Sequence, residues 1–342
     1  MTLVTKEYNI IVKALGFFTL FVIFSHFFCC EAIASDYNFE NALKKANTFD
    51  NINSDSTLYY AKIAFNEAKK ERDKQLELKA LIFLAKANLK AGKQADAIIN
   101  CAAAIDIVKN NNIALAEVLM YYGVAYQAAG YSSESINYLL EAQDEIVKNQ
   151  NFDLAIDLDY YTALAYIEIK KYDIGIKYLN NSIRKSIDHE YPVGAFKSYI
   201  LLSNLFQRAD SIQKYLALAE SVIEEAPELA YEKAALRNNQ ALVNKAIGEF
   251  ELAHKQYSDA INIARSNRFD TYLANFNNNF AYLLMAEHKY DSAGIVLAEA
   301  LQIAKEIGNL DLQASVYDSY ADYFAAVGRH DLAFVYQDSS FV

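Results

Sequence analysis

The feature that most constrains the fold of this chain is a recurrence of small residues at an interval of about 40 residues, a period typical of stacked supersecondary units. Six anchor positions mark this period: Gly92, Gly130, Lys170, Gly248, His288 and Gly328. The interval from Lys170 to Gly248 is twice as long as the others, so it holds one further unit. Seven residues before each anchor, and five and twelve residues after it, all eighteen positions hold Ala, Gly or Ser.

Larger residues recur at fixed steps between the small ones, which predicts two closely packed helices in each unit. Four residues before their anchors lie Tyr126, Tyr166, Leu284 and Phe324, and nine residues after them lie Leu139, Leu179, Tyr257 and Leu297. The chain is 54% hydrophobic, yet it holds only 10 Gly and 2 Pro, which leaves few turns for a β-sandwich or barrel. We therefore expect an all-α chain in which each anchor is a left-handed turn between a helix A and a helix B.

This pattern resembles the tetratricopeptide repeat, which places a small and then an aromatic residue late in helix A and Ala with a large residue in helix B. The stretches 122–142 and 241–260 match it best. The period is nearer 40 than the roughly 34 residues usual for the family, and so resembles its longer, kinesin-light-chain-like members. The family's Trp is absent, and its closing Pro appears only as Pro227, after a degenerate unit that fits only through Leu216 and Ala219.

The resemblance implies an all-α, right-handed superhelical solenoid of about eight helix-turn-helix units, whose concave wall is formed by helix A. We expect this solenoid to occupy residues 35–342. The expected units span roughly 37–74, 75–112, 113–150, 151–190, 191–230, 231–270, 271–310 and 311–342.

Residues 1–34 have the pattern of a secretory signal peptide. Two lysines precede an apolar stretch over 14–28, and a small-x-small motif ends at Ala34, which predicts cleavage between Ala34 and Ser35. We expect export to the periplasm or cell envelope, with no membrane span left after cleavage. The alternative is an uncleaved N-terminal anchor, although the apolar run is shorter than the roughly 20 residues of a typical span. Cleavage would leave Cys101 as the only cysteine, which precludes an intramolecular disulfide.

The residues offer little for catalysis. The five histidines are scattered without the spacing of a zinc helix, and no phosphate-binding loop, nucleophile elbow or dinucleotide fingerprint occurs. Cys101 falls on a helix B position that holds Leu in other units, which favours packing over reactivity. A net charge of -11 argues against a nucleic-acid partner. We therefore predict no enzyme, no cofactor and no metal site.

Two asparagine pairs are the candidate binding residues. Asn238 and Asn239 lie ten and nine residues before Gly248, and Asn278 and Asn279 lie at the same places before His288. In helix A these positions are expected to face the concave wall, where an amide can donate to and accept from a peptide main chain. The kinesin-light-chain resemblance implies that an Asn pair here contacts bound peptide. The alternative is ordinary exposed surface, because the chain uses Asn freely.

Tyrosines one or two repeats earlier, at Tyr160, Tyr161 and Tyr199, can supply apolar anchors for the same peptide or can be ordinary packing. We expect a non-enzymatic scaffold of the bacterial cell envelope that holds a protein or peptide in its concave groove. The alternative is a sensory module, because exported arrays of this kind resemble the N-terminal part of certain membrane-bound histidine kinases and regulators.

The closing helix B is expected to expose apolar side chains. Around Gly328 it offers Leu332, Phe334, Val335, Tyr336 and Phe341, too many to bury on one side. Because repeat arrays need a polar outer face on the terminal unit for solubility, this end is expected to self-associate or to dock a partner.

Overall fold

The structure is a computed structural model that describes residues 38–50, 54–108, 112–147, 151–224, 226 and 228–339. The expected signal peptide and its cleavage site at Ala34 and Ser35 lie outside the described residues, as do Pro227 and Phe341. Across the described ranges the chain forms sixteen α-helices, α2 to α17, and no strand. The expected all-α fold is confirmed.

The helices follow one another as eight consecutive pairs of helix A and helix B. In the first half these are α2 (Phe39–Phe49) with α3 (Ser54–Glu71), α4 (Lys74–Lys90) with α5 (Gln94–Ile107), α6 (Asn112–Ala128) with α7 (Ser132–Val147), and α8 (Phe152–Glu168) with α9 (Tyr172–Asp188). In the second half they are α10 (Pro192–Asn204) with α11 (Ala209–Ile223), α12 (Ala230–Ala246) with α13 (Phe250–Ser266), α14 (Asp270–Ala286) with α15 (Tyr290–Glu306), and α16 (Leu310–Ala326) with α17 (His330–Ser339).

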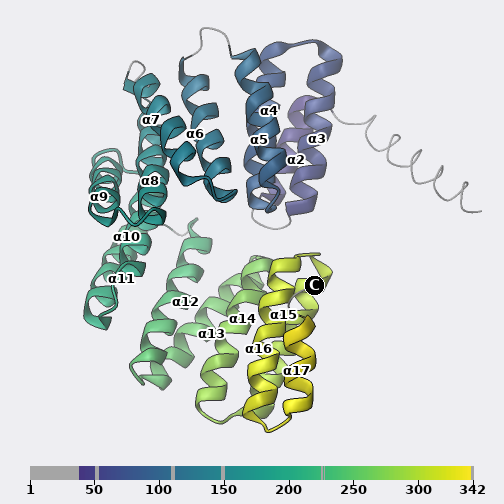
Figure 1. Cartoon of the computed structure of the whole chain (residues 1–342), viewed down its shortest axis with the longest axis vertical. Coiled ribbons are helices and arrows are strands. Elements are labelled where there is room, and N and C mark those ends of the chain that lie inside the picture. The colour runs from purple at the N-terminus through teal and green to yellow at the C-terminus, as the bar shows by residue number, and fades with distance from the viewer. Residues whose placement is uncertain are drawn as a thin grey trace, which may run out of the picture.

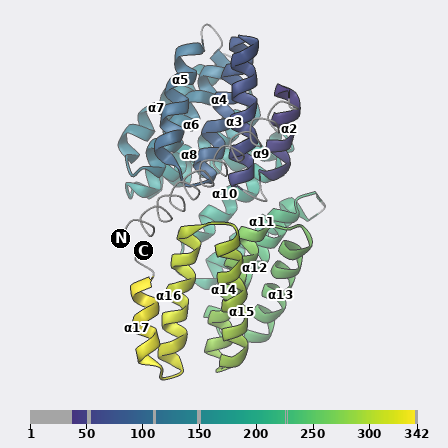
Figure 2. The ribbon, with the colours of Figure 1, turned by 90° about the vertical axis from the view of Figure 1, so that its right-hand side faces the viewer.

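The pairs stack into a right-handed superhelix with the helices A on its inner side. Each helix packs against its neighbours in the sequence, and from α4 onward each helix A also contacts the next helix A. Figure 1 shows α2–α9 above α12–α17, with α10 and α11 joining the two groups along one side. Figure 2, turned by 90°, shows the same two groups stacked one over the other.

The turns between helix A and helix B sit where the repeat places them. All six anchors have left-handed backbone, with φ between 58° for His288 and 87° for Gly130. In each of these turns the next residue donates its amide to a carbonyl five residues back, as Lys93 does to Asn88 at 2.8 Å. Glycine adopts this conformation without a steric cost, which explains its presence at four anchors. The degenerate unit differs, because no residue with positive φ separates α10 from α11.

The small residues lie where two helices approach closely. In the five anchored units before the last, all fifteen small positions are buried. In the last unit Ala321 and Ala333 are half-buried, and Ser340 lies outside the described residues. A Cβ atom added to Gly123 would lie 2.8 Å from Leu139 Cγ and 3.1 Å from the carbonyl oxygen of Ser135. Helices α6 and α7 therefore meet at a distance that only glycine permits.

Replacing Gly123 by Ala is expected to destabilise the fold, although Ala is the better helix former by about 1 kcal/mol. Overpacking against the buried Leu139 costs about 1–3 kcal/mol, which exceeds that gain. The matched control is Gly294→Ala on α15, where the added methyl meets only the hydroxyl end of Tyr323 at 3.0 Å. Urea unfolding followed by circular dichroism should show a lower midpoint for Gly123→Ala and an equal or higher one for Gly294→Ala.

None of the helices within the described ranges combines the length and the apolarity that crossing a bilayer requires.

Candidate functional site

The candidate site is the concave wall, and its C-terminal half carries a strip of short polar side chains that we call the amide strip. Its members are Asn238 and Asn239 on α12, Asn275, Asn278 and Asn279 on α14, and Ser315 and Ser319 on α16. Hydrogen bonds join these members across successive helices. The Asn279 amide donates to Asn238 Oδ1 at 3.0 Å and to Asn275 Oδ1 at 3.1 Å, and Asn278 donates to Ser315 Oγ at 3.5 Å. The strip is therefore continuous over three repeats.

The two members of each asparagine pair occupy different environments. Asn238 and Asn278 are only 6% exposed, whereas Asn239 and Asn279 are half-buried. We expected both members of each pair to face the concave wall, but successive residues of a helix point about 100° apart. The first member is therefore buried and the second is accessible. Contact with a bound peptide remains a prediction for all four residues.

The accessible pair retains unused hydrogen-bonding capacity. Asn239 Oδ1 accepts from the Asn238 amide at 3.4 Å, and the Asn279 amide has the two acceptors given above. Among the described residues, the Asn239 amide nitrogen and Asn279 Oδ1 have no hydrogen-bond partner. They offer a ligand one donor and one acceptor, which are the groups that a peptide main chain pairs with.

The N-terminal half of the wall carries a charged register that the sequence analysis missed. Lys79, Glu117, Asp157 and Lys197 follow one another at the repeat interval, and the first three lie thirteen residues before their anchors. The last two form an ion pair, with Lys197 Nζ 3.4 Å from Asp157 Oδ1. The repeat spacing was the signal that could have found them.

Aromatic residues lie one helical turn after these charges, at Phe83, Tyr121 and Tyr161. Near the first two, α2, α4 and α6 enclose a hollow of about 350 Å³. Its lining consists of Leu43, Asn47, Lys79, Ile82, Phe83, Lys86, Glu117 and Tyr121. The lining thus combines lysine and glutamate side chains with aliphatic and aromatic ones, a composition that suits a ligand side chain with an apolar body and a polar end.

Burial perturbs the ionisable groups of this half of the wall. Desolvation raises the pKa of the Glu117 carboxyl, and the nearby Lys86 ammonium opposes that rise only in part. Burial also raises the pKa of Tyr121, with Tyr161, Glu117 and Asp157 adding to the effect. Ionisable groups perturbed by burial in a hollow are frequent at functional sites, which makes this half of the wall a binding candidate.

The three tyrosines that were expected as apolar anchors are partly packed. Tyr160 and Tyr161 meet edge to face with ring centroids 5.4 Å apart, and burial raises the pKa of Tyr160 to about 12. Tyr160 and Tyr199 pack against the same core cluster around Leu179. All three side chains are half-buried, so part of each surface remains accessible.

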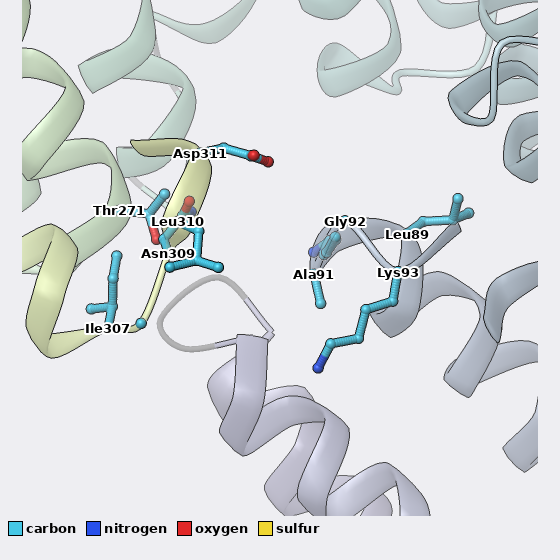
Figure 3. Close-up of a pocket in the computed structure, with 11 residues that line it drawn as sticks. Leu89, Ala91, Gly92, Lys93, Thr271, Ile307, Asn309, Leu310 and Asp311 are labelled. Atoms are coloured by element: carbon cyan, nitrogen blue, oxygen red, sulfur yellow. The ribbon is translucent and has the colours of Figure 1, made fainter. Parts of the chain in front are cut away.

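A second hollow, of about 520 Å³, lies where distant parts of the superhelix approach each other. One wall is the turn from Leu89 to Lys93, and the other is the segment from Ile307 to Asp311, together with Thr271. Figure 3 shows these two walls facing each other, with Lys93 on one and Asp311 on the other. One turn of the solenoid thus brings Gly92 and Gly308, which are far apart in the sequence, to the same opening.

The residue types that most often act in catalysis, cysteine and histidine, are buried in the core or paired with other side chains at Cys101 and His254. Cys101 is 1% exposed, and burial raises the pKa of its thiol to about 12, which keeps it neutral and inert. His254 pairs with Glu287, whose other carboxylate oxygen lies 3.0 Å from Lys289 Nζ. Over the described ranges, no group of three or more His, Cys, Asp or Glu side chains is placed to hold a metal ion. The absence of an enzymatic activity remains a prediction.

Comparison with known proteins shows the fold. No protein-family model matches the chain, and no curated protein is similar to it in sequence. The Rap conjugation gene regulator of the plasmid pLS20, solved in complex with a peptide, superposes with a TM-score of 0.56 at 16% identity over 84% of each chain. Aspartyl phosphate phosphatase F from Bacillus subtilis gives 0.60 at 14% identity, over 82% of this chain and 74% of that one.

A Rap protein complexed with competence and sporulation factor gives a TM-score of 0.55 at 13% identity, covering 89% of this chain and 95% of that one. At these identities the likeness shows a tetratricopeptide-like helical repeat fold, similar to that of the Rap regulators.

Proposed function

We propose that this chain is a peptide-binding regulatory module whose concave wall holds an extended segment. The observation that carries the proposal is the division of that wall into a continuous amide strip and a charged, aromatic half with a hollow of about 350 Å³. Two of the similar structures support it, because one is a gene regulator in complex with a peptide and another is complexed with competence and sporulation factor. They favour the sensory alternative over a plain scaffold.

The two halves of the wall would recognise different parts of the peptide, one its main chain and the other a side chain. The Asn239 amide and Asn279 Oδ1 pair with the main chain, which gives affinity with little dependence on sequence. The hollow beside Phe83 and Tyr121 takes one side chain with an apolar body, which gives selectivity. This division agrees with the peptide contact that the kinesin-light-chain resemblance implies for the Asn pair.

Regulation would follow from the position of the degenerate unit between the two halves. Helices α10 and α11 connect the charged half to the amide strip, and α12 meets α11 through polar side chains as well as through the apolar cluster that contains Leu216 and Leu236. Arg237 and Gln240 of α12 both contact Glu220 of α11, at 2.8 Å and 2.9 Å. A peptide that contacts both halves spans the contact between α11 and α12. It therefore stabilises the curvature of the solenoid in which both halves reach it.

We further propose that the chain works outside the cytoplasm, after cleavage at Ala34.

A selection of random peptides displayed on phage against the purified protein tests this function. We expect enrichment of peptides that share an apolar side chain with a polar end, and binding at least about tenfold weaker to Tyr121→Ala. The matched control is Tyr172→Ala, which removes an exposed tyrosine from helix B of the fourth pair. Failure to enrich any peptide, or equal binding to both variants, would argue against a peptide site in this wall.

A further inference from the structure

The last helix of the structure leaves apolar side chains exposed. No residue of α17, from His330 to Ser339, is buried, and Phe334 and Val335 are 72% and 54% exposed. In the preceding units the next helix A covers the equivalent of Phe334, six residues after the anchor. A Cβ atom on Gly294 would lie 3.0 Å from the Tyr323 hydroxyl of α16, and the ring of His254 lies 5.2 Å from that of Phe280 on α14. Phe334 therefore occupies a position at which the fold otherwise places a helix.

At the opposite end of the described stack, the outer side of helix α2 is polar. Helix α2 buries Phe39, Ala42, Leu43 and Ala46. Its other side carries the exposed residues Asn41, Lys44 and Lys45. A head-to-tail contact would press Phe334 against charged and amide groups, which costs desolvation without apolar gain. Among the described residues, α2 therefore offers Phe334 no apolar partner.

We propose that α17 pairs with α17 of a second copy of this chain, in antiparallel orientation about a twofold axis at Phe334. His330, Phe334 and Asp338 lie four residues apart, so they share one face of the helix, and all three are exposed. In an antiparallel pair centred on Phe334, His330 of each copy faces Asp338 of the other. The face is therefore complementary to itself, because the His330 imidazole can donate a hydrogen bond to the facing Asp338 carboxylate on either side of the central Phe334, and a twofold interface requires such self-complementarity.

The expected dimer is weak. One ten-residue helix per copy buries less than the roughly 800 Å² per partner of a standard stable interface. Association should therefore appear only at high micromolar concentration. It does not depend on the proposed peptide site, because α17 lies on the outer side of the last pair and the amide strip lies on the helices A.

Sedimentation equilibrium of the purified protein, from about 10 µM to about 1 mM, tests the proposal. The weight-average mass of the native chain should rise toward that of a dimer, and Phe334→Asp should stay monomeric throughout. Asp338→Lys should weaken association about tenfold, and the double variant His330→Asp with Asp338→Lys should restore it, because the facing charges are then opposite. The matched control is Ile295→Asp, which changes an equally exposed apolar residue (70%) on α15 and should leave association intact.

Three results would overturn the proposal. A native chain that is monomeric at the highest concentration would exclude pairing between two copies of α17. The exposed face of α17 would then be a binding site for a helix of another protein. Equal loss of association in Ile295→Asp would place the contact elsewhere. A double charge variant as weak as Asp338→Lys would contradict the antiparallel pairing.

Discussion

Replacing Leu139 by Ala is expected to lower the free energy of unfolding by about 2–5 kcal/mol, the range for large-to-small changes in a core. Leu139 is fully buried on α7, nine residues after the Gly130 anchor, in a cluster with Leu119, Met120 and Leu158. The lost side chain lies against Gly123 of α6, and its cluster extends to Leu158 of the following unit, so the cavity lies near a junction between repeats. Closing it would require two helices to shift, and Gly123 already holds them in close contact.

Urea unfolding followed by circular dichroism measures this change, and Ile99→Ala provides the control. Ile99 is an exposed aliphatic residue on α5, and its truncation should change stability by less than about 0.5 kcal/mol. Because repeat arrays can unfold in parts, the slope of the transition must be compared along with its midpoint. A stability of Leu139→Ala equal to that of Ile99→Ala would show that the assignment of core positions to the repeat is wrong.

The double replacement Asn239→Ala with Asn279→Ala is expected to weaken peptide binding by about ten- to a hundredfold. Each hydrogen bond contributes about 0.5–1.5 kcal/mol net, and about 1.4 kcal/mol corresponds to a tenfold change in affinity. Both side chains are half-buried on the concave wall and hold the unused donor and acceptor of the amide strip. Titration calorimetry with a selected peptide measures the effect.

Helix content and melting temperature should change little in this variant, because Ala is a better helix former than Asn. The control is Asn180→Ala with Asn262→Ala, which removes two exposed asparagines from α9 and α13, both helices B. Equal affinity in the two double variants would show that Asn239 and Asn279 are ordinary surface residues that do not contact the peptide. A large fall in melting temperature would instead show that the hydrogen bonds of Asn279 to Asn238 and Asn275 serve packing.

The repeat was predictable from the sequence because packing enforces it at every unit. A position such as Ala281 or Gly123 must be small wherever two helices meet, so the same requirement recurs in unit after unit and is visible without a structure. The left-handed turns follow from the same regularity. Even Lys170 and His288, which lack the freedom of glycine, adopt positive φ because their neighbours fix the turn.

The candidate site was only partly predictable, because side chains on the concave wall are not constrained by packing. Asn238 and Asn239 are adjacent in the sequence, but the local rotation of α12 decides which is buried. The charged register changes sign from Lys79 to Glu117, so a search for identical residues passes over it. The opening between Gly92 and Gly308 depends on small rotations summed over several units, one of which is degenerate.

Hydrogen–deuterium exchange with and without a selected peptide tests the central claim most directly, because it reports which face of the solenoid the peptide covers. We predict slower exchange in the helices A that form the wall, above all α12 and α14 at the amide strip and α4 and α6 at the hollow. Exchange in the helices B, such as α9 and α13, should not change. Protection confined to the helices B, or absent under saturating peptide, would contradict a peptide site on the concave wall.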